Sequence, residues 1–250
     1  MNTKITHAMK ELQTNFYKIQ CRNWIPSRFA GTGGAGRTLE DLLGLVENSD
    51  VLPDYEGIEI KTRYGTDKYP ISLFSCAFDS QPMEMKRLLL TCGYQDPKYP
   101  DLKRFNTSMK ASHQKYFRTT YSFRLKVDRE KQVIKLRILN RITGEVDDTM
   151  SWSFKELKSR LEHKLSYLAL VKVKKDQIGE TVYYKYRDLT LYKLKGFETF
   201  IDLFEKGKIS VIFKLSQRHT EEKYVEIYDK GTNFSIYEKD IELLFDKIEV

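Results

Sequence analysis

The chain has few cysteines and no long apolar run. Its 250 residues include three cysteines, Cys21, Cys76 and Cys92, an odd number with no C-x-x-C spacing. This pattern argues against a disulfide framework or a zinc site, so we expect reduced thiols in a reducing cytosol. No apolar stretch reaches the roughly eighteen residues of a transmembrane helix. The N-terminal residues also lack the apolar segment of a signal peptide.

Histidine is scarce as well, and acidic residues are outnumbered. The four histidines are scattered and suggest no metal triad. Lysine and arginine total 43 against 35 acidic residues, which gives a net charge of +8. This excess favours a polyanionic partner. The 40% hydrophobic and 13% aromatic content is typical of a folded globular protein, long enough for one large domain or two lobes.

The hydrophobic periodicity predicts helices and strands in mixed order. Helices are expected over residues 6–21, 38–45, 154–168, 197–205 and 239–245. Strands are expected over residues 58–61, 71–78, 121–127, 132–139, 167–174, 181–186, 209–215 and 233–237. Residues 95–120 are polar and are expected to form a long loop. Because no regular βαβ repeat is present, the pattern predicts an α/β protein with a mixed sheet.

Two polar residues are expected to cap helices. Thr38 precedes the apolar residues of the second helix, and Ser153 with Glu156 forms a capping-box pattern. The glycine-rich segment before Thr38 imitates a nucleotide-binding P-loop with Arg37 in place of lysine. A P-loop also needs a buried strand before its first glycine, whereas the approach here contains Pro26. Nucleotide binding is therefore disfavoured, although such a loop could contact nucleic-acid phosphates through its amides.

Two acids and a lysine lie close together around a turn and a short strand. Strand side chains alternate between faces, so Glu59 and Lys61 point the same way, and Asp54 can fold back across the turn at Gly57 to meet Glu59. Converging carboxylates suit a hard divalent cation, and a neighbouring ammonium can hold a water beside it. This set is sufficient for metal-assisted hydrolysis of a phosphodiester. The alternative is an ordinary solvated Glu-x-Lys pair on a sheet face.

Two other charged features have two interpretations each. Glu40 is either a solvated charge near a helix N-terminus, which spacing alone favours, or a third acid of the same site. The tract from residue 214 to residue 230 is either a solvated hairpin arm or an arm that reads bases, because arginine and histidine can donate to guanine in the major groove.

Several of these segments resemble one known family. The run Gly36–Leu43, then Asp54 and the Ile58–Thr62 strand, is similar to the MvaI/BcnI restriction endonucleases, relatives of the strand-nicking repair enzyme MutH within the PD-(D/E)xK nucleases. Further similar segments follow in the same order: Ser151-Trp152-Ser153-Phe154, Lys164-Leu165, Tyr183–Tyr186, and Gly231-Thr232 with Phe234 and Ile236. The resemblance extends from about residue 31 to the C-terminus.

The resemblance implies a fold and a set of catalytic residues. It implies a MutH-like mixed sheet flanked by helices, with two lobes around a DNA cleft. We expect a catalytic lobe over residues 1–150 and a DNA-recognition lobe over residues 151–250. Asp54, Glu59 and the carbonyl of Ile60 would bind Mg²⁺, which Mn²⁺ could replace. Lys61 would position the attacking water, and Glu40 would be the additional acid.

The resemblance also implies a function. We expect a monomeric type II restriction endonuclease that hydrolyses a short specific duplex DNA sequence, one strand at a time, in the cytoplasm of a bacterium. A cognate DNA methyltransferase is expected in the same system. The alternatives are a MutH-like nicking repair enzyme and a non-catalytic sequence-specific DNA-binding protein. The residues expected to contact DNA are Lys68, Lys110, Lys185, Lys214, Arg218, His219, Tyr228 and Lys230.

Overall fold

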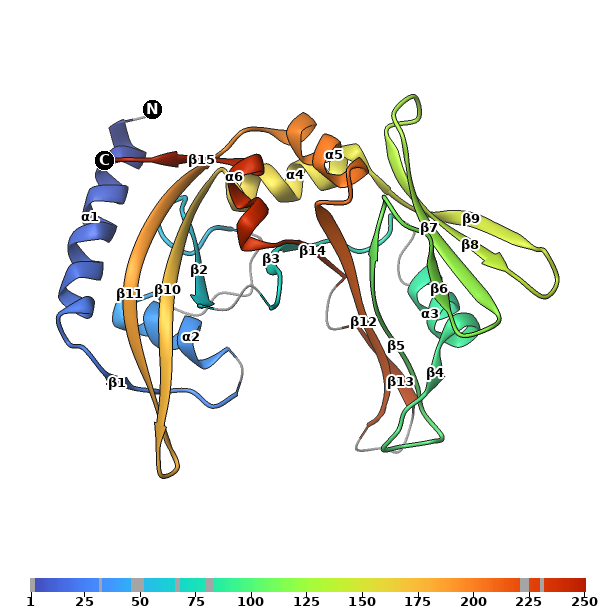
Figure 1. Ribbon diagram of the computed structural model, residues 1–250, viewed down its shortest axis with the longest axis horizontal. Helices are drawn as coiled ribbons and strands as arrows, with labels where there is room; N and C mark the ends of the chain where they lie inside the picture. Colours follow the sequence, from blue (N-terminus) through green and yellow to red (C-terminus); the bar gives the residue numbers. More distant parts are fainter. Residues whose placement is uncertain are drawn as a thin grey trace. The chain divides into compact units, whose positions relative to one another are not determined.

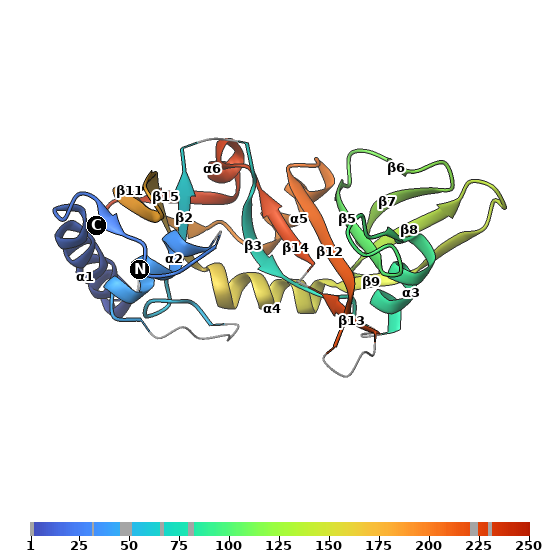
Figure 2. The same cartoon turned by 90° about the horizontal axis from the view of Figure 1, so that it is seen from below.

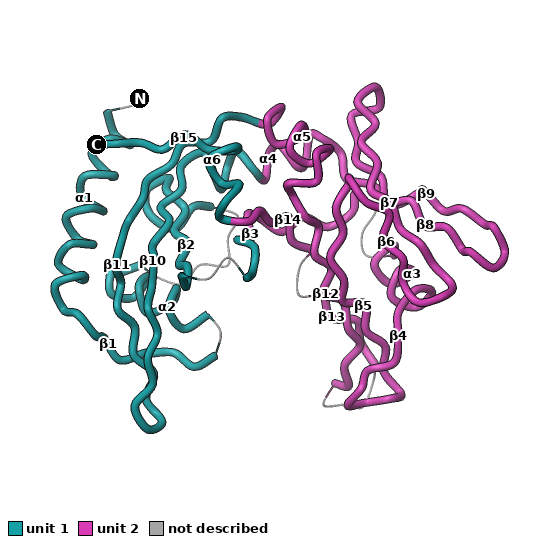
Figure 3. Tube along the Cα trace, viewed as in Figure 1, with its two compact units in different colours: residues 1–71, 161–196, 238–250 teal, residues 72–160, 197–237 magenta. Residues whose placement is uncertain are grey.

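The computed structural model describes residues 3–31, 33–45, 52–65, 68–79, 83–220, 225–229 and 232–250. The chain divides into two compact units, one of residues 1–71, 161–196 and 238–250 and the other of residues 72–160 and 197–237 (Figure 3). Each unit takes segments from both sides of residue 150. The expected boundary at that position therefore does not separate them, because strands far apart in sequence pair within each unit.

Unit 1 contains a mixed sheet, as the sequence predicted. Its elements are α1 (Thr3–Gln20), β1 (Ile25–Pro26), α2 (Gly34–Leu42), β2 (Glu59–Tyr64), β10 (Tyr167–Ile178), β11 (Thr181–Leu194), the 3-10 turn η1 (Glu238–Asp240), α6 (Ile241–Leu244) and β15 (Phe245–Ile248). The strand order is β1-β11-β10-β2, with β15 also paired to β11. Only β2 and β10 run parallel among the described strands of this sheet.

Helix α1 covers one face of this sheet. The helix lies alongside β10 and β11 in Figure 1. Its residues Met9, Leu12 and Phe16 recur at helical spacing and share a buried cluster with Ile60 of β2 and Val171 of β10. Because Ile60 points into this core, its neighbours Glu59 and Lys61 point to the opposite face of β2.

Unit 2 contains two sheets and, among its described residues, two complete helices. Its elements are β3 (Ile71–Ser75), α3 (Met83–Cys92), β4 (Tyr94–Gln95), β5 (Lys103–Lys110), β6 (Lys115–Phe117), β7 (Tyr121–Asp128), β8 (Val133–Asn140), β9 (Val146–Ser153), α5 (Phe197–Glu205), β12 (Ile209–His219), β13 (Val225–Asp229) and β14 (Asn233–Ile236). One sheet has the order β3-β14-β12-β5-β4 with β13 paired to β12, and the other has the order β6-β7-β8-β9 (Figure 2). The residues of α4 (Phe154–Leu165) are divided between the two units.

Aromatic side chains fill the core of unit 2. The ring of Phe105 on β5 lies 5.5 Å from that of Phe123 on β7 and 5.6 Å from that of Phe213 on β12. Trp152 is fully buried, and its indole nitrogen donates to the carbonyl of Cys76 at 3.1 Å. The two sheets of this unit therefore share one core, and the opposite face of β7 and β8 is left to solvent.

Several expected elements are confirmed. Helix α5 has the predicted bounds, and Ser153 accepts a hydrogen bond from the Glu156 amide at 3.4 Å, which is one of the two bonds of a capping box. The hairpin of β7 and β8 agrees within one residue at each strand end. Within the expected arm, residues 215–219 of β12 pair with residues 225–229 of β13 in an antiparallel manner. None of the described helices is long and apolar enough to cross a membrane.

Other expectations were wrong. Residues 95–120 are not one long loop, because β5 and β6 lie within them; Phe105 and Met109 are buried on one face of β5 while polar residues occupy the other. Thr38 does not cap α2, which begins four residues earlier; it is buried within the helix. The expected helix over residues 239–245 is the short turn η1 and helix α6, and β15 follows it.

Two of the three cysteines are buried. Cys76 and Cys92 lie in unit 2, Cys21 is exposed, and all three are free thiols. Burial raises the pKa of Cys76 and of Cys92 to about 12, so both stay protonated at neutral pH.

Candidate active site

Strand β2 holds the central acid and the lysine. Glu59 is only 1% exposed, and its Oε1 lies 2.5 Å from Nζ of Lys61. The register of β2 against β10 places Glu59 beside Leu168 and Lys61 beside Leu170. Both polar residues therefore lie on a sheet face whose neighbouring strand contributes apolar side chains; Glu59 is shielded from water, whereas 26% of the Lys61 side chain is exposed.

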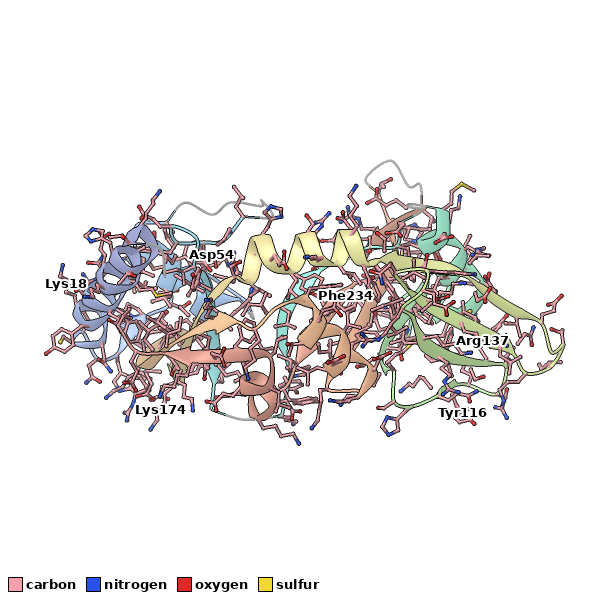
Figure 4. The ribbon with its side chains drawn as sticks, turned by 90° about the horizontal axis from the view of Figure 1, so that it is seen from above. Lys18, Asp54, Tyr116, Arg137, Lys174 and Phe234 are labelled. Carbon is pink, nitrogen blue, oxygen red and sulfur yellow. The ribbon has the colours of Figure 1, made fainter. Side chains whose placement is uncertain are left out.

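Asp54 reaches this strand through a tight turn. Tyr55 and Ile58 exchange backbone hydrogen bonds of 2.9 and 2.8 Å, and Gly57 between them has a φ of 92°, which favours glycine. The chain thereby reverses, and Oδ2 of Asp54 accepts a hydrogen bond from the amide of Ile60 at 2.9 Å. Asp54 (labelled in Figure 4) is thus fixed beside the residue that follows Glu59.

The surroundings of Glu59 are unfavourable for an isolated charge. Burial raises the pKa of its carboxyl, Lys61 opposes that shift, and the negative charge of Asp54 raises the pKa further. Within the described part of the chain, Oε2 of Glu59 is buried and has no hydrogen-bond partner. A buried carboxylate oxygen without a donor needs a positive partner or a proton.

The oxygen atoms around Glu59 fit a divalent metal ion. The carboxylates of Asp54 and Glu59 and the backbone carbonyl of Ile60 are oxygen donors of the kind that Mg²⁺ accepts. No cluster of three or more histidine, cysteine or acidic side chains suited to a metal occurs among the described residues.

Glu40 lies beside β2. Its Oε1 and the Oγ1 of Thr62 are 3.7 and 3.6 Å from the position that a Cβ on Gly36 would occupy. Glu40 thus approaches the strand that carries Glu59 and Lys61 without joining Asp54 and Glu59 in a three-acid cluster. Thr62 alternates with Lys61 along β2, so this contact lies on the face of the strand opposite to Glu59 and Lys61.

The helix that carries Glu40 is held close to β11. A Cβ on Gly34 would lie 2.6 Å from the hydroxyl of Tyr184 and 2.8 Å from the carbonyl of Phe29. The hydroxyl of Tyr186 donates to the carbonyl of Ala35 at 2.8 Å. Gly34 therefore has a packing role, since it lets the start of α2 approach the sheet.

A second lysine near Glu59 was not recognised as a site residue from the sequence. Nζ of Lys164, on α4, lies 3.5 Å from Oε1 of Glu59. Lys164 occurs in one of the segments that carried the family resemblance, and it follows Leu161 by three positions on the helix. Those signals place it near a buried face, but only the packing of α4 against β2 reveals its acidic partner.

Four of the residues expected to contact DNA share one sheet face of unit 2. Paired residues in antiparallel strands point to the same face, and side chains two apart along a strand do so as well. By this rule the register of β5, β12 and β13 places on one face Lys110, Lys214, Arg218 and Tyr228. The guanidinium of Arg218 lies 4.2 Å from the centre of the Tyr228 ring and is paired with Glu226.

The remaining expected contacts lie elsewhere. His219 points to the opposite face of β12, where Nε2 lies 2.8 Å from a carboxylate oxygen of Asp101. Lys68 follows β2, with its ammonium 5.8 Å from the centre of the Tyr69 ring. Lys185 lies on β11, directly opposite Lys174 on β10. Lys230 lies outside the described residues.

Comparison with known proteins identifies the family. The MvaI/BcnI restriction endonuclease family model matches residues 13–245. The fold matches that of restriction endonuclease MvaI in a complex with its cognate DNA substrate, with a TM-score of 0.87 at 24% identity. It also matches MvaI in the absence of DNA, with a TM-score of 0.62 at 22% identity. Each match covers 99% of this chain and 98% of the other. No curated protein matches the sequence.

The matched residues include Glu40, Asp54, Glu59 and Lys61, and the match extends over nearly the whole chain. It favours the restriction-enzyme interpretation over a DNA-binding protein without catalytic activity. The chain belongs to the MvaI/BcnI restriction endonuclease family and is a type II site-specific nuclease.

Proposed function

We propose that this protein is a Mg²⁺-dependent endonuclease that hydrolyses phosphodiester bonds within a short specific sequence of duplex DNA. The observation that carries the proposal is the buried Oε2 of Glu59, which lacks a hydrogen-bond donor among the described residues, beside Lys61 and close to Asp54. Burying these charges without a ligand is costly, and binding duplex DNA alone needs no converging acids, which repel phosphate. A site for a cation and a phosphate explains both features.

The proposed roles are those that the family resemblance implies, and the contacts of Glu59 and Asp54 support them. Asp54, Glu59 and the carbonyl of Ile60 would hold a Mg²⁺ ion, which when bound would supply stabilisation of charge on the phosphate and a water of lowered pKa. Lys61 orients the attacking water with its ammonium, which Glu59 holds in place at 2.5 Å. Lys164 shares the carboxylate of Glu59 and limits the rotation of that side chain. Glu40 lies beside β2 and acts as the additional acid of the site.

The sheet face that carries Lys110, Lys214, Arg218 and Tyr228 is the proposed DNA-reading surface of unit 2. Arg218 has a restricted position, because Glu226 and the Tyr228 ring hold it, so little side-chain entropy is lost when it binds a base. We expect Arg218→Ala to cost about 1–3 kcal/mol on the target sequence and to relax the choice of base at one position. A uniform loss of affinity on all sequences would instead assign Arg218 to a phosphate.

The proposal is tested by incubating plasmid DNA with the pure protein and Mg²⁺. The wild type should nick and then linearise the plasmid, since a monomer with one site cuts one strand per binding event. Asp54→Ala should bind DNA and fail to cut it. Equal cleavage by both proteins would remove Asp54 from the mechanism. Sequencing of the product ends identifies the target sequence and the position of the cut.

The second candidate is a nicking enzyme that depends on an activating partner, as MutH-like repair enzymes do. The same incubation separates the two, because uncoupled double-strand cleavage by the pure protein favours the restriction enzyme. We place that enzyme in the reducing cytoplasm of a bacterium with a cognate methyltransferase that protects the host DNA. A methylated plasmid that resists cleavage would support this assignment.

A further inference from the structure

Strands β7 and β8 of unit 2 carry two pairs of basic residues that face each other across the hairpin. The register places Arg124 directly opposite Arg137, and Lys126 directly opposite Lys135. All four side chains point to the same face of the β6–β9 sheet, because paired residues and residues two apart share a face. We call these four residues the basic face.

The basic face is open to solvent. Phe123 and Leu125 on β7, with Ile134 and Leu136 on β8, point the other way and are almost fully buried in the core of unit 2. Arg124 and Lys126 are exposed, and Arg137 and Lys135 are partly exposed. Figure 4 labels Arg137 and, on the edge strand β6, Tyr116, which is 60% exposed and faces the guanidinium of Arg141 at 5.2 Å.

No ion pair or hydrogen bond holds the four basic side chains within the described residues. Two other arginines of this unit are paired: Arg87 binds Asp147 at 2.8 Å, and Arg129 contacts three carboxylates of α5. The acids that share a hollow with Lys126, Lys135 and Arg137 are Asp128, Glu130 and Asp148, and none of them forms an ion pair with these side chains. The positive charge of the basic face is therefore available to a partner.

The two pairs of like charges on β7 and β8 are unfavourable for the stability of the fold. Like charges directly opposite in adjacent strands are destabilising, and threonine or tyrosine would suit an exposed strand better. Two such pairs in succession occupy one hairpin. Beside them is a hollow of about 310 Å³, lined by Arg124, Lys126 and Arg137 with the polar side chains of Gln114 and Ser122, and no acid of the described chain lines it. This arrangement suits a strongly anionic partner.

We infer that the basic face binds the phosphate backbone of duplex DNA outside the sequence that is cut. The inference rests on the proposed function for the choice of DNA among polyanions. Four basic groups on neighbouring strand positions present closely spaced positive charges, and duplex DNA is a dense linear array of negative ones. Binding here is independent of sequence, because no base contact is needed. It retains the enzyme on DNA between cleavage events.

The test compares two double variants that remove the same amount of charge. Arg124→Gln with Arg137→Gln removes one opposed pair, and Lys10→Gln with Lys18→Gln removes two exposed lysines of α1 as the control. Affinity for a random-sequence duplex is measured without metal ion over a range of NaCl concentrations. We expect the basic-face variant to lower the slope of log affinity against log salt by about 0.9 for each phosphate that the protein no longer neutralises, and the control to leave it unchanged.

A second pair of measurements separates this inference from the proposed function. Both variants should cut a short duplex containing the target at the wild-type rate when the enzyme is saturating. On a long plasmid with competitor DNA, the basic-face variant should cut more slowly. Slower cutting of the plasmid but not of short duplexes assigns the basic face to flanking DNA of the same molecule, whereas weaker binding to added competitor assigns it to a separate duplex.

Equal salt slopes for the basic-face variant and the control would overturn the inference while leaving the cleavage activity intact. A different outcome is that the wild type does not cleave DNA while the basic-face variant still has a reduced slope of log affinity against log salt. That result would overturn the proposed function and leave the basic face as a DNA-binding surface. Thermal unfolding provides the check on folding: removal of a repulsive pair should leave the melting temperature unchanged or raised. Lys126→Gln with Lys135→Gln repeats the test on the second pair.

Discussion

The carboxylate of Asp54 accepts a hydrogen bond from the backbone amide of Ile60 at 2.9 Å, across a turn that begins at the next residue. This bond fixes the acid beside Glu59 before any ligand binds. A preorganised carboxylate loses little side-chain entropy on binding a cation, and its charge already raises the pKa of Glu59. The turn and the strand therefore act as one element.

Two substitutions at Asp54 separate its charge from its hydrogen bond. Asp54→Asn keeps an acceptor for the Ile60 amide and loses the charge, so its melting temperature should match the wild type while plasmid cleavage falls by about 100-fold or more. Asp54→Ala loses both and should also unfold more easily by about 1 kcal/mol. Cleavage rates and urea unfolding curves provide the two measurements. A cleavage rate for Asp54→Asn near that of the wild type would show that its charge is not used.

Removal of the charge of Glu59 should affect metal binding more than folding. Burial raises the pKa of this carboxyl, so its ionised form is a cost in the metal-free protein, and Glu59→Gln should unfold at or above the wild-type temperature without metal. The wild type should gain about 2.7 kcal/mol when Mg²⁺ is present at roughly 100 times its dissociation constant. We expect Glu59→Gln to lose most of that gain. Thermal shift over a Mg²⁺ series is the measurement, and an unaltered shift would exclude Glu59 as a ligand.

The start of α2 tolerates a side chain at one glycine and not at its neighbour. A Cβ on Gly34 would meet the Tyr184 hydroxyl and the Phe29 carbonyl at 2.6 and 2.8 Å, whereas a Cβ on Gly33 would have its nearest neighbour at 3.8 Å. Gly34→Ala should therefore cost about 1–3 kcal/mol and displace the helix that carries Glu40. Gly33→Ala is the matched control and should unfold and cleave like the wild type. Denaturant unfolding and single-turnover cleavage compare the two, and equal behaviour would show that α2 adjusts freely.

Asp96 should control stability at acid pH. Burial acts to raise the pKa of its carboxyl, but the amides of Lys98 and Tyr99 and the Arg104 guanidinium outweigh burial and hold that pKa below its usual range. A depressed pKa contributes stability above the unfolded value, about 3.9, and that stability is lost as pH falls through the folded value. Asp96→Asn should thus be less stable at neutral pH and lose less on acidification below about pH 4. Unfolding curves at several pH values test this, and parallel pH profiles would contradict it.

Short-range sequence patterns were sufficient to predict the elements that depend on interactions between residues close together in the chain. The alternation of β2 places Glu59 and Lys61 on one face, the turn at Gly57 brings Asp54 back, and the spacing of apolar residues gives α5 its bounds. Each follows from interactions within a few residues. Helix η1–α6 and strand β15 were misread because their segments are too short for a period to be distinguished.

Residues 95–120 are a segment whose structure could not be predicted from short-range sequence patterns. Strand β5 has two buried side chains, Phe105 and Met109, among polar neighbours, and it becomes a strand because β12, which is distant in the sequence, pairs with it. The approach of Lys164 to Glu59 has the same origin. A strand with few apolar residues shows little hydrophobic alternation in its sequence. The neighbouring strand supplies the hydrogen bonds that make the segment extended.

The sequence alone indicated the candidate acids, the lysine, the strand shared by Glu59 and Lys61, and the family. The tertiary structure decided which side chains meet from distant elements: Lys164 with Glu59, Arg218 with Tyr228, and the opposed pairs of β7 and β8. The division of the chain into two discontinuous units was also decided there. The physical reason is that strand register and helix packing depend on buried surface shared between segments far apart in the chain, which no local pattern encodes.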